Sequence, residues 1–134
     1  GDFSFAAELG AIATTDADAL TGLLVRNGRE TDAPGLFFGL RGDGRAALYR
    51  RERGSAAEPV ELAASSSFLP CRLRIVRHGR RFLAAISGDG TTWQPFAECP
   101  LDLAPTVRVG LAVASHQPGA MATAEFRDLT MLVP

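Results

Sequence analysis

The 134-residue sequence predicts an all-β protein whose antiparallel strands pack as a sandwich or a barrel. Short runs of alternating apolar and polar residues are separated by Gly, Asp and Pro clusters at intervals of about 8–12 residues. The one helical candidate, Asp16–Leu24, contains Thr21 and Gly22, which both disfavour a helix. We therefore expect about ten strands and no helix, in a single domain that spans residues 1–134.

The first half of the chain is expected to hold five strands. Phe3 and Phe5 alternate with polar neighbours, as residues of a half-buried strand do. Gly42-Asp43-Gly44 supplies the positive φ that a tight hairpin turn needs. The expected strands are Asp2–Leu9, Leu20–Arg26, Gly35–Arg41, Arg45–Arg51 and a short one around Val60–Leu62.

The second half predicts a meander of three strands followed by two more. The turns of the meander are marked by His78-Gly79 and by Gly88-Asp89-Gly90. The expected strands are Arg72–Arg77, Arg81–Ser87, Thr92–Glu98, Val107–Ser115 and Ala122–Leu132.

The two cysteines are predicted to be free thiols. Cys71 opens the meander and Cys99 closes it, so they lie at opposite ends of an up-down-up arrangement. A rise of about 3.3 Å per residue separates them by roughly 20 Å, which is far beyond the reach of a disulfide.

Charge and hydropathy argue against two classes of partner. The net charge of −1 lacks the basic surplus that a nucleic acid or an anionic membrane would attract. No run of about 18 apolar residues is present, so we expect no membrane-spanning segment. The N-terminal sequence lacks a basic start and a long apolar core, so we expect no signal peptide in this chain.

Four segments carry a resemblance to a known family. They are GDFSFAAEL at the N-terminus, ALTGLLVRNG, LRIVRHGRRFLAAISGDGTTW and VGLAVASHQPGAMATAEFRDL. Together they resemble bacterial modules of the concanavalin A-like lectin/glucanase superfamily, which are appended to secreted enzymes and surface proteins. The resemblance covers nearly all of Asp2–Leu129.

The resemblance implies a jelly-roll β-sandwich of two antiparallel sheets, one of them concave. It also favours an extracellular or cell-surface location, although the sequence itself leaves the location unknown. Members of the family carry more chain before the strand that begins GDF. Either that N-terminal strand segment is trimmed or lies on another chain, or an edge of a sheet is left open here.

Catalysis is not expected. Glycosidases of this superfamily use paired carboxylates on one strand face, which requires an even spacing. Glu125 and Asp128 come nearest to such a pair, and their odd spacing places them on opposite faces of a regular strand. Ser115-His116 has no nucleophile-elbow context, and His78 lies in a turn. A degenerate glucanase-like hydrolase is therefore ranked last.

Two aromatic residues are candidates for stacking on a sugar. Trp93 alternates with Pro95 and Ala97, so burial in the core is favoured over binding. Tyr49 alternates with Ala47 and Arg51 on a mixed face, so it lies either in a polar groove or at the surface with its hydroxyl in solvent.

The arginines have the clearest pattern. Arg72, Arg74 and His78 share one strand face, and Leu73, Ile75 and Arg77 share the other. If the strands are neighbours, a polar stripe that also includes Arg108, Glu125 and Arg127 crosses one sheet. A solvated stripe with cross-strand ion pairs is favoured over a groove for hydroxyl-rich or acidic glycans.

No cofactor or metal is expected. Asp16, Asp18 and Asp43 could supply oxygen ligands, but they form no dense calcium-loop motif, and ordinary turn roles are favoured.

The preferred hypothesis is a non-catalytic accessory module that binds carbohydrate on a concave sheet face or on rim loops. The alternative is an assembly domain that self-associates or contacts a neighbouring domain, with the apolar C-terminal residues favouring this alternative. The expected ligand-binding residues are Arg26, Asn27, Tyr49, Arg74, His116 and Gln117.

Overall fold

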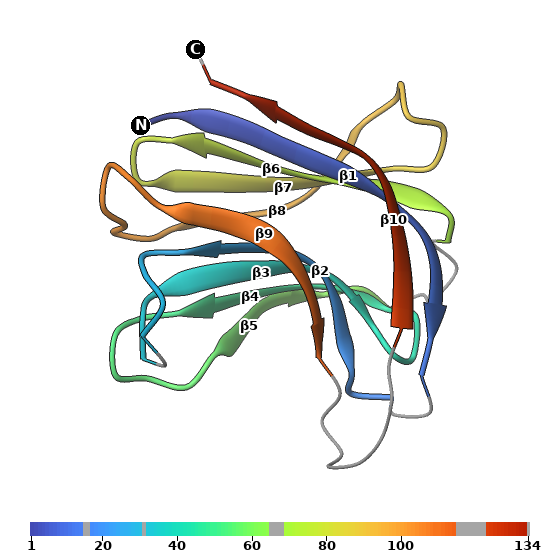
Figure 1. Ribbon diagram of the computed structural model, residues 1–134, viewed down its shortest axis with the longest axis horizontal. Helices are drawn as coiled ribbons and strands as arrows, with labels where there is room; N and C mark the ends of the chain where they lie inside the picture. The colour runs from blue at the N-terminus through green and yellow to red at the C-terminus, as the bar shows by residue number, and fades with distance from the viewer. Residues whose placement is uncertain (15–16, 31, 65–68, 115–122, 134) are drawn as a thin grey trace.

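The computed structural model describes residues 1–14, 17–30, 32–64, 69–114 and 123–133, which form ten strands and no helix. None of the described segments is a helix long and apolar enough to span a membrane. The strands, labelled in Figure 1, are β1 (Phe3–Ala13), β2 (Leu20–Arg26), β3 (Gly35–Arg41), β4 (Ala46–Arg51), β5 (Glu58–Leu62), β6 (Cys71–His78), β7 (Arg81–Ser87), β8 (Gln94–Pro100), β9 (Arg108–Ala114) and β10 (Thr123–Leu132).

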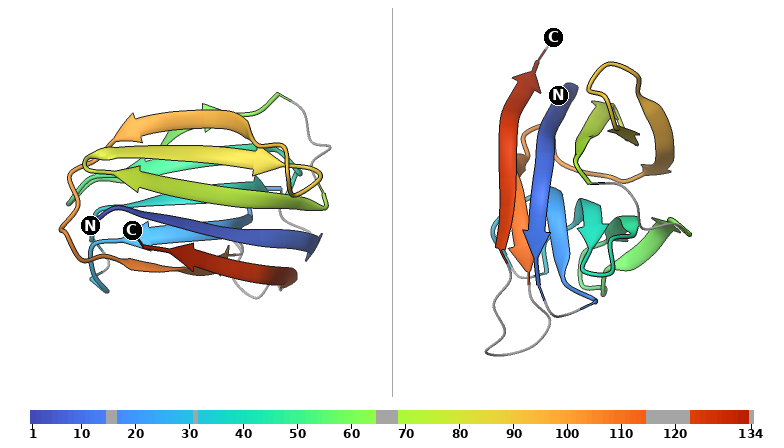
Figure 2. Two further views of the ribbon diagram at one scale, coloured as in Figure 1. Left: turned by 90° about the horizontal axis from the view of Figure 1, so that it is seen from above. Right: turned by 90° about the vertical axis from the view of Figure 1, so that its right-hand side faces the viewer.

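The strands form two five-stranded antiparallel sheets. Sheet A has the order β10-β1-β6-β7-β8, and sheet B has the order β5-β4-β3-β2-β9. The two sheets pack face to face, with β9 and β10 along one side and β5 and β8 along the other (Figure 2). The predicted meander is confirmed as β6-β7-β8, and the hairpin around Gly42-Asp43-Gly44 joins β3 to β4.

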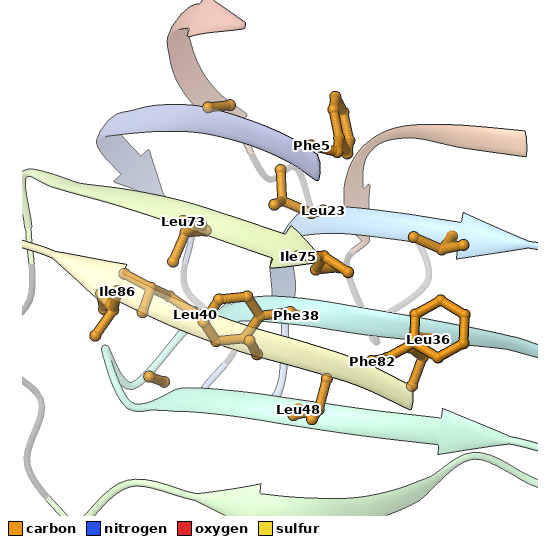
Figure 3. Packing of buried hydrophobic residues seen from close by; sticks show 14 of the residues in the cluster. Phe5, Leu23, Leu36, Phe38, Leu40, Leu48, Leu73, Ile75, Phe82 and Ile86 are labelled. Atoms are coloured by element: carbon orange, nitrogen blue, oxygen red, sulfur yellow. The ribbon is translucent and has the colours of Figure 1, made fainter. Parts of the chain in front are cut away.

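The core lies between the sheets and is built by strict alternation along the central strands. Every second residue of β6 and β7 faces inward, so Leu73 and Ile75 meet Phe82 and Ile86 from the neighbouring strand. From sheet B, Leu23, Leu36, Phe38, Leu40 and Leu48 pack against them (Figure 3).

The cation Arg77 faces the core. Arg77 is 6% exposed and lies on the inner face of β6, as its alternation with Leu73 and Ile75 predicts. Its guanidinium donates hydrogen bonds to the carbonyls of Gly79, Leu103 and Ala104 at 2.8–2.9 Å and lies 5.5 Å from the ring centre of Phe82. These bonds attach the segment between β8 and β9 to sheet A.

Both cysteines are free, as predicted, and both are buried. Cys71 begins β6 and Cys99 is near the end of β8, so they lie at opposite ends of the meander. Burial disfavours the charged thiolate, and it raises the pKa of Cys71 to about 12 and raises the pKa of Cys99.

Candidate functional site

The candidate site is a hollow of about 390 Å³ on the outer face of sheet B. Its floor is a row formed by Leu24, Phe37 and Tyr49, which are cross-strand neighbours on β2, β3 and β4. The hollow is lined by Leu24, Arg26, Ala33, Gly35, Leu36, Phe37, Tyr49, Arg51 and Ala57.

Two arginines form the next row of the same face. Arg26 and Arg51 both pair with Gly35, which lies between them on β3. Gly35 has no side chain to separate the arginines, and a Cβ there would lie 2.5 Å from the carbonyl oxygen of Val25 and 3.2 Å from Cγ of Arg26. A glycine at this position therefore brings two guanidiniums to the end of an apolar floor.

The same arginines donate hydrogen bonds to backbone carbonyls of two nearby segments. The guanidinium of Arg26 donates a hydrogen bond to the carbonyl of Glu30, and Nε of Arg51 donates to the carbonyl of Ser55 at 2.9 Å. Each of these bonds uses one of the five N–H donors of a guanidinium, so further donors remain for a ligand.

The phenol of Tyr49 is fixed at the β4 end of the floor, beside Arg51. Its ring lies 6.3 Å from that of Phe37, centre to centre, at an angle of 49°. Its oxygen accepts a hydrogen bond from Nη1 of Arg41 at 3.2 Å, and this bond is the largest cause of the raised pKa of Arg41. Because the tyrosine oxygen accepts here, its own proton can be donated to a ligand.

Small residues lie beside this row. Gly22 and Gly39 are paired across β2 and β3, and a Cβ on Gly22 would lie 2.5 Å from Cα of Gly39. Ala47 and Ala112 continue the row on either side. Gly22, Gly39 and Ala47 are buried, so this row adds no large side chain beside the aromatic floor.

The structure brings together two of the expected binding residues, Arg26 and Tyr49. Asn27 serves the fold instead, because its Oδ1 accepts a hydrogen bond from the backbone N–H of Ala104 at 2.7 Å. Arg74 lies on sheet A, away from this hollow, and His116 and Gln117 lie outside the described residues.

Sequence reasoning missed Leu24, Phe37 and Arg51 as lining residues. Leu24 and Phe37 lie in continuous apolar runs, in which alternation does not show which residue faces outward. The available signal was the pairing of Gly35 with Arg51, which follows from the length of the β3–β4 hairpin.

The expectation that Trp93 is buried in the core is wrong. A β-bulge in β8 pairs Ala84 with Ala97 but Ala85 with Pro95, so the alternation from Trp93 to Ala97 is broken. The indole is half-buried on the outer face of sheet A, where the guanidinium of Arg74 lies 4.2 Å from its ring centre.

The expected polar stripe is present only in part. Glu8 on β1 pairs with Arg72 on one side and with Arg127 on the other, which gives a row of alternating charge across sheet A. Arg108 lies on β9 in sheet B and is therefore not part of this stripe.

The described lining of the hollow on sheet B contains no carboxylate pair of the kind that glycosidases use. In the part of the chain that the structure describes, no carboxylate lines it. Within the same residues, no group of three or more His, Cys, Asp or Glu side chains is arranged to hold a metal ion.

Comparison with known proteins places the chain by its fold. No model of a protein family and no curated protein matches the sequence. A functionally unknown protein from Saccharomyces cerevisiae is similar in structure with a TM-score of 0.77 and 18% identity, over 99% of this chain and 70% of that one. A native heptameric SAP-like pentraxin from Limulus polyphemus is similar with a TM-score of 0.53 and 10% identity, over 97% of this chain and 63% of that one.

These likenesses establish the fold. The pentraxin is a jelly-roll sandwich of the concanavalin A-like type, and the two five-stranded antiparallel sheets of this chain have the same architecture. The fold class predicted from the sequence is therefore confirmed.

Proposed function

We propose that the chain is a non-catalytic domain that binds carbohydrate in the hollow on sheet B. The observation that carries the proposal is the arrangement of two rows on one sheet face. A row with two aromatic rings, Phe37 and Tyr49, lies directly beside a row with two guanidiniums, Arg26 and Arg51.

This arrangement suits the two sides of a sugar ring. The C–H groups of a pyranose pack on apolar and aromatic surface, and its hydroxyls accept hydrogen bonds from guanidinium N–H groups. The volume of about 390 Å³ is at the lower end of the range of roughly 300–1,000 Å³ for small-molecule sites. One or two sugar units are the expected occupant.

A glycan array with the purified chain tests the proposal. We expect saturable binding to a limited set of glycans, with loss of binding in Tyr49→Ala and in Arg51→Gln. Arg74→Gln, on the other sheet, is the matched control and should leave binding unchanged. Binding that is lost only in Arg74→Gln, or no binding to any glycan, would contradict the proposal.

A second candidate function, assembly, is favoured by the edges of the two sheets. The edge strands β5 and β8 contain Pro59, Pro95 and Pro100, which block pairing with another strand. The edge strands β9 and β10 contain no proline and expose apolar side chains at fractions between 41% and 69%, namely Leu111, Val113, Leu129, Met131 and Leu132.

For this second function we propose a second copy of the chain as the partner, with β10 pairing antiparallel to its own copy. A two-fold axis at Phe126 would place Glu125 opposite Arg127 of the second copy, so the charges are complementary. The heptameric pentraxin shows that a related fold is found in an oligomer.

Light scattering on a size-exclusion column tests this pairing. We expect a dimer, weakened by Arg127→Glu and restored by Arg127→Glu combined with Glu125→Arg. A monomer over the whole accessible concentration range, or a dimer that is insensitive to both variants, would rule out the β10 interface.

A further inference from the structure

The outer face of sheet A has a second hollow, of about 440 Å³, on the opposite side of the molecule from the proposed sugar site. We propose that this hollow binds an organic carboxylate with an apolar body, with Arg74 holding the carboxylate. The site is lined by Arg74, Val76, His78, Leu83, Ala84, Ala85, Trp93, Pro95, Phe96, Ala97 and Glu98.

Among the described residues, the charge of Arg74 has no carboxylate partner. Its cross-strand neighbours are Ala6 on β1 and Ala85 on β7, and the next residue in the row is Pro95. Its Nε is fully enclosed, and among the described residues it is the one enclosed side-chain nitrogen or oxygen with no hydrogen-bond partner. An enclosed guanidinium N–H without an acceptor is unfavourable, and an anionic ligand would supply both an acceptor and a matching charge.

Neighbouring arginines on the same face do have partners. Arg72 pairs across the strands with Glu8 and donates a hydrogen bond to the carbonyl of Asp128 at 3.1 Å. Arg81 binds both carboxylate oxygens of Glu98 at 2.7 and 2.8 Å. The anion preference of the hollow is therefore specific to Arg74.

Trp93 fixes the position of Arg74. The guanidinium carbon lies 4.2 Å from the centre of the indole ring, which is the geometry of a cation–π contact. Because the side chain is already held in place, binding an anion costs less side-chain entropy than ordering a mobile arginine would.

An apolar surface continues from Arg74 along the hollow. Val76 and Leu83 are cross-strand neighbours in the next row and are both partly exposed to the hollow. The acidic group at the far end, Glu98, is neutralised by Arg81, and His78 lies 3.8 Å from Asp2. A ligand with one carboxylate for Arg74 and a short alkyl or aryl body for the apolar surface beside it matches this hollow.

The single tryptophan of the chain makes the proposal measurable by fluorescence. Hexanoate is the probe, hexanamide is the control that lacks the charge, and acetate is the control that lacks the apolar body. We expect a saturable change in Trp93 emission with hexanoate, and binding at least about tenfold weaker with either control.

The matched variants are Arg74→Gln, which should weaken hexanoate binding by about tenfold or more, and Arg108→Gln, which should leave it unchanged. If Arg74→Gln does not fold, the NMR signal of the Arg74 Nε–H group in the natural chain should shift on titration with hexanoate and not with hexanamide. Equal binding of hexanoate and hexanamide, an unmoved Arg74 signal, or no saturable change would overturn the proposal.

Discussion

Arg26 and Arg51 lie on opposite sides of Gly35 in one row of sheet B, and the glycine is the reason that both guanidiniums reach the same hollow. The backbone here has no room for a side chain. The candidate site therefore depends on the packing of three strands as well as on the chemistry of the arginines.

Gly35→Ala is expected to lower the free energy of unfolding by about 1–3 kcal/mol, since the new Cβ would clash with the carbonyl of Val25. Gly110→Ala is the matched control, because a Cβ on that strand glycine meets nothing within 4 Å and should change stability by about 0.5 kcal/mol or less. Urea denaturation measures both. Equal losses of stability in the two variants would show that the clash with the Val25 carbonyl does not cause the effect of Gly35→Ala.

Arg77→Met is expected to destabilise the fold by about 2 kcal/mol or more, because it leaves half-buried carbonyls without their charged donor. Arg80→Met is the control, since its exposed ion pair with Asp102 should contribute about 0–1 kcal/mol. Thermal unfolding of the two variants gives the comparison. A loss of stability in Arg80→Met as large as that in Arg77→Met would contradict the role assigned to Arg77.

The two cysteines are expected to resist alkylation in the native state, because burial raises the pKa of both thiols and keeps them protonated at pH 8. Both should react with iodoacetamide once the chain is unfolded in urea. An exposed thiol introduced by Asp102→Cys serves as the positive control, since Asp102 is at the surface. Stoichiometric labelling of the native chain within the time that labels this control would contradict the prediction.

Asp89 is expected to make stability depend on pH. Its Oδ1 accepts hydrogen bonds from the N–H groups of Thr91 and Thr92 and from the hydroxyl of Ser87, and these bonds lower its pKa below the ordinary 3.8. A lowered pKa in the folded state gives stability that is present above about pH 4 and is lost as the pH falls further.

This contribution is measured by unfolding the natural chain and Asp89→Asn at a series of pH values. The series runs from about pH 7 to about pH 2.5 and so brackets the ordinary pKa of 3.8. The natural chain should be the more stable at neutral pH, and the difference should shrink below about pH 4. A difference that stays constant over the whole range would show that the carboxylate charge makes no contribution.

Most of the fold could be predicted because the strands of this protein alternate cleanly and the turns are marked by glycine. The hairpin turns at Gly44, Gly79 and Gly90 all have positive φ at these glycines. The helical candidate fails, as Gly22 predicts, since its C-terminal part belongs to β2. The strand ends differ by a few residues, and β1 continues to Ala13 because β10 pairs with it that far.

The candidate site was harder to predict, since it depends on which strands become neighbours. Arg26 and Tyr49 were named from their chemistry, but Arg74 belongs to the other sheet, and sheet order is not visible in a single sequence. Trp93 shows a second limit, because one extra residue in a bulge reverses the face that alternation assigns.

The most direct test of the account is an NMR titration of the uniformly ¹⁵N-labelled chain with a glycan that the array identifies. We expect the largest shifts at the amides of Leu24, Phe37 and Tyr49 and at the Nε–H groups of Arg26 and Arg51. Shifts confined to β6, β7 and β8, or no shifts at saturating glycan, would contradict carbohydrate binding in the hollow on sheet B.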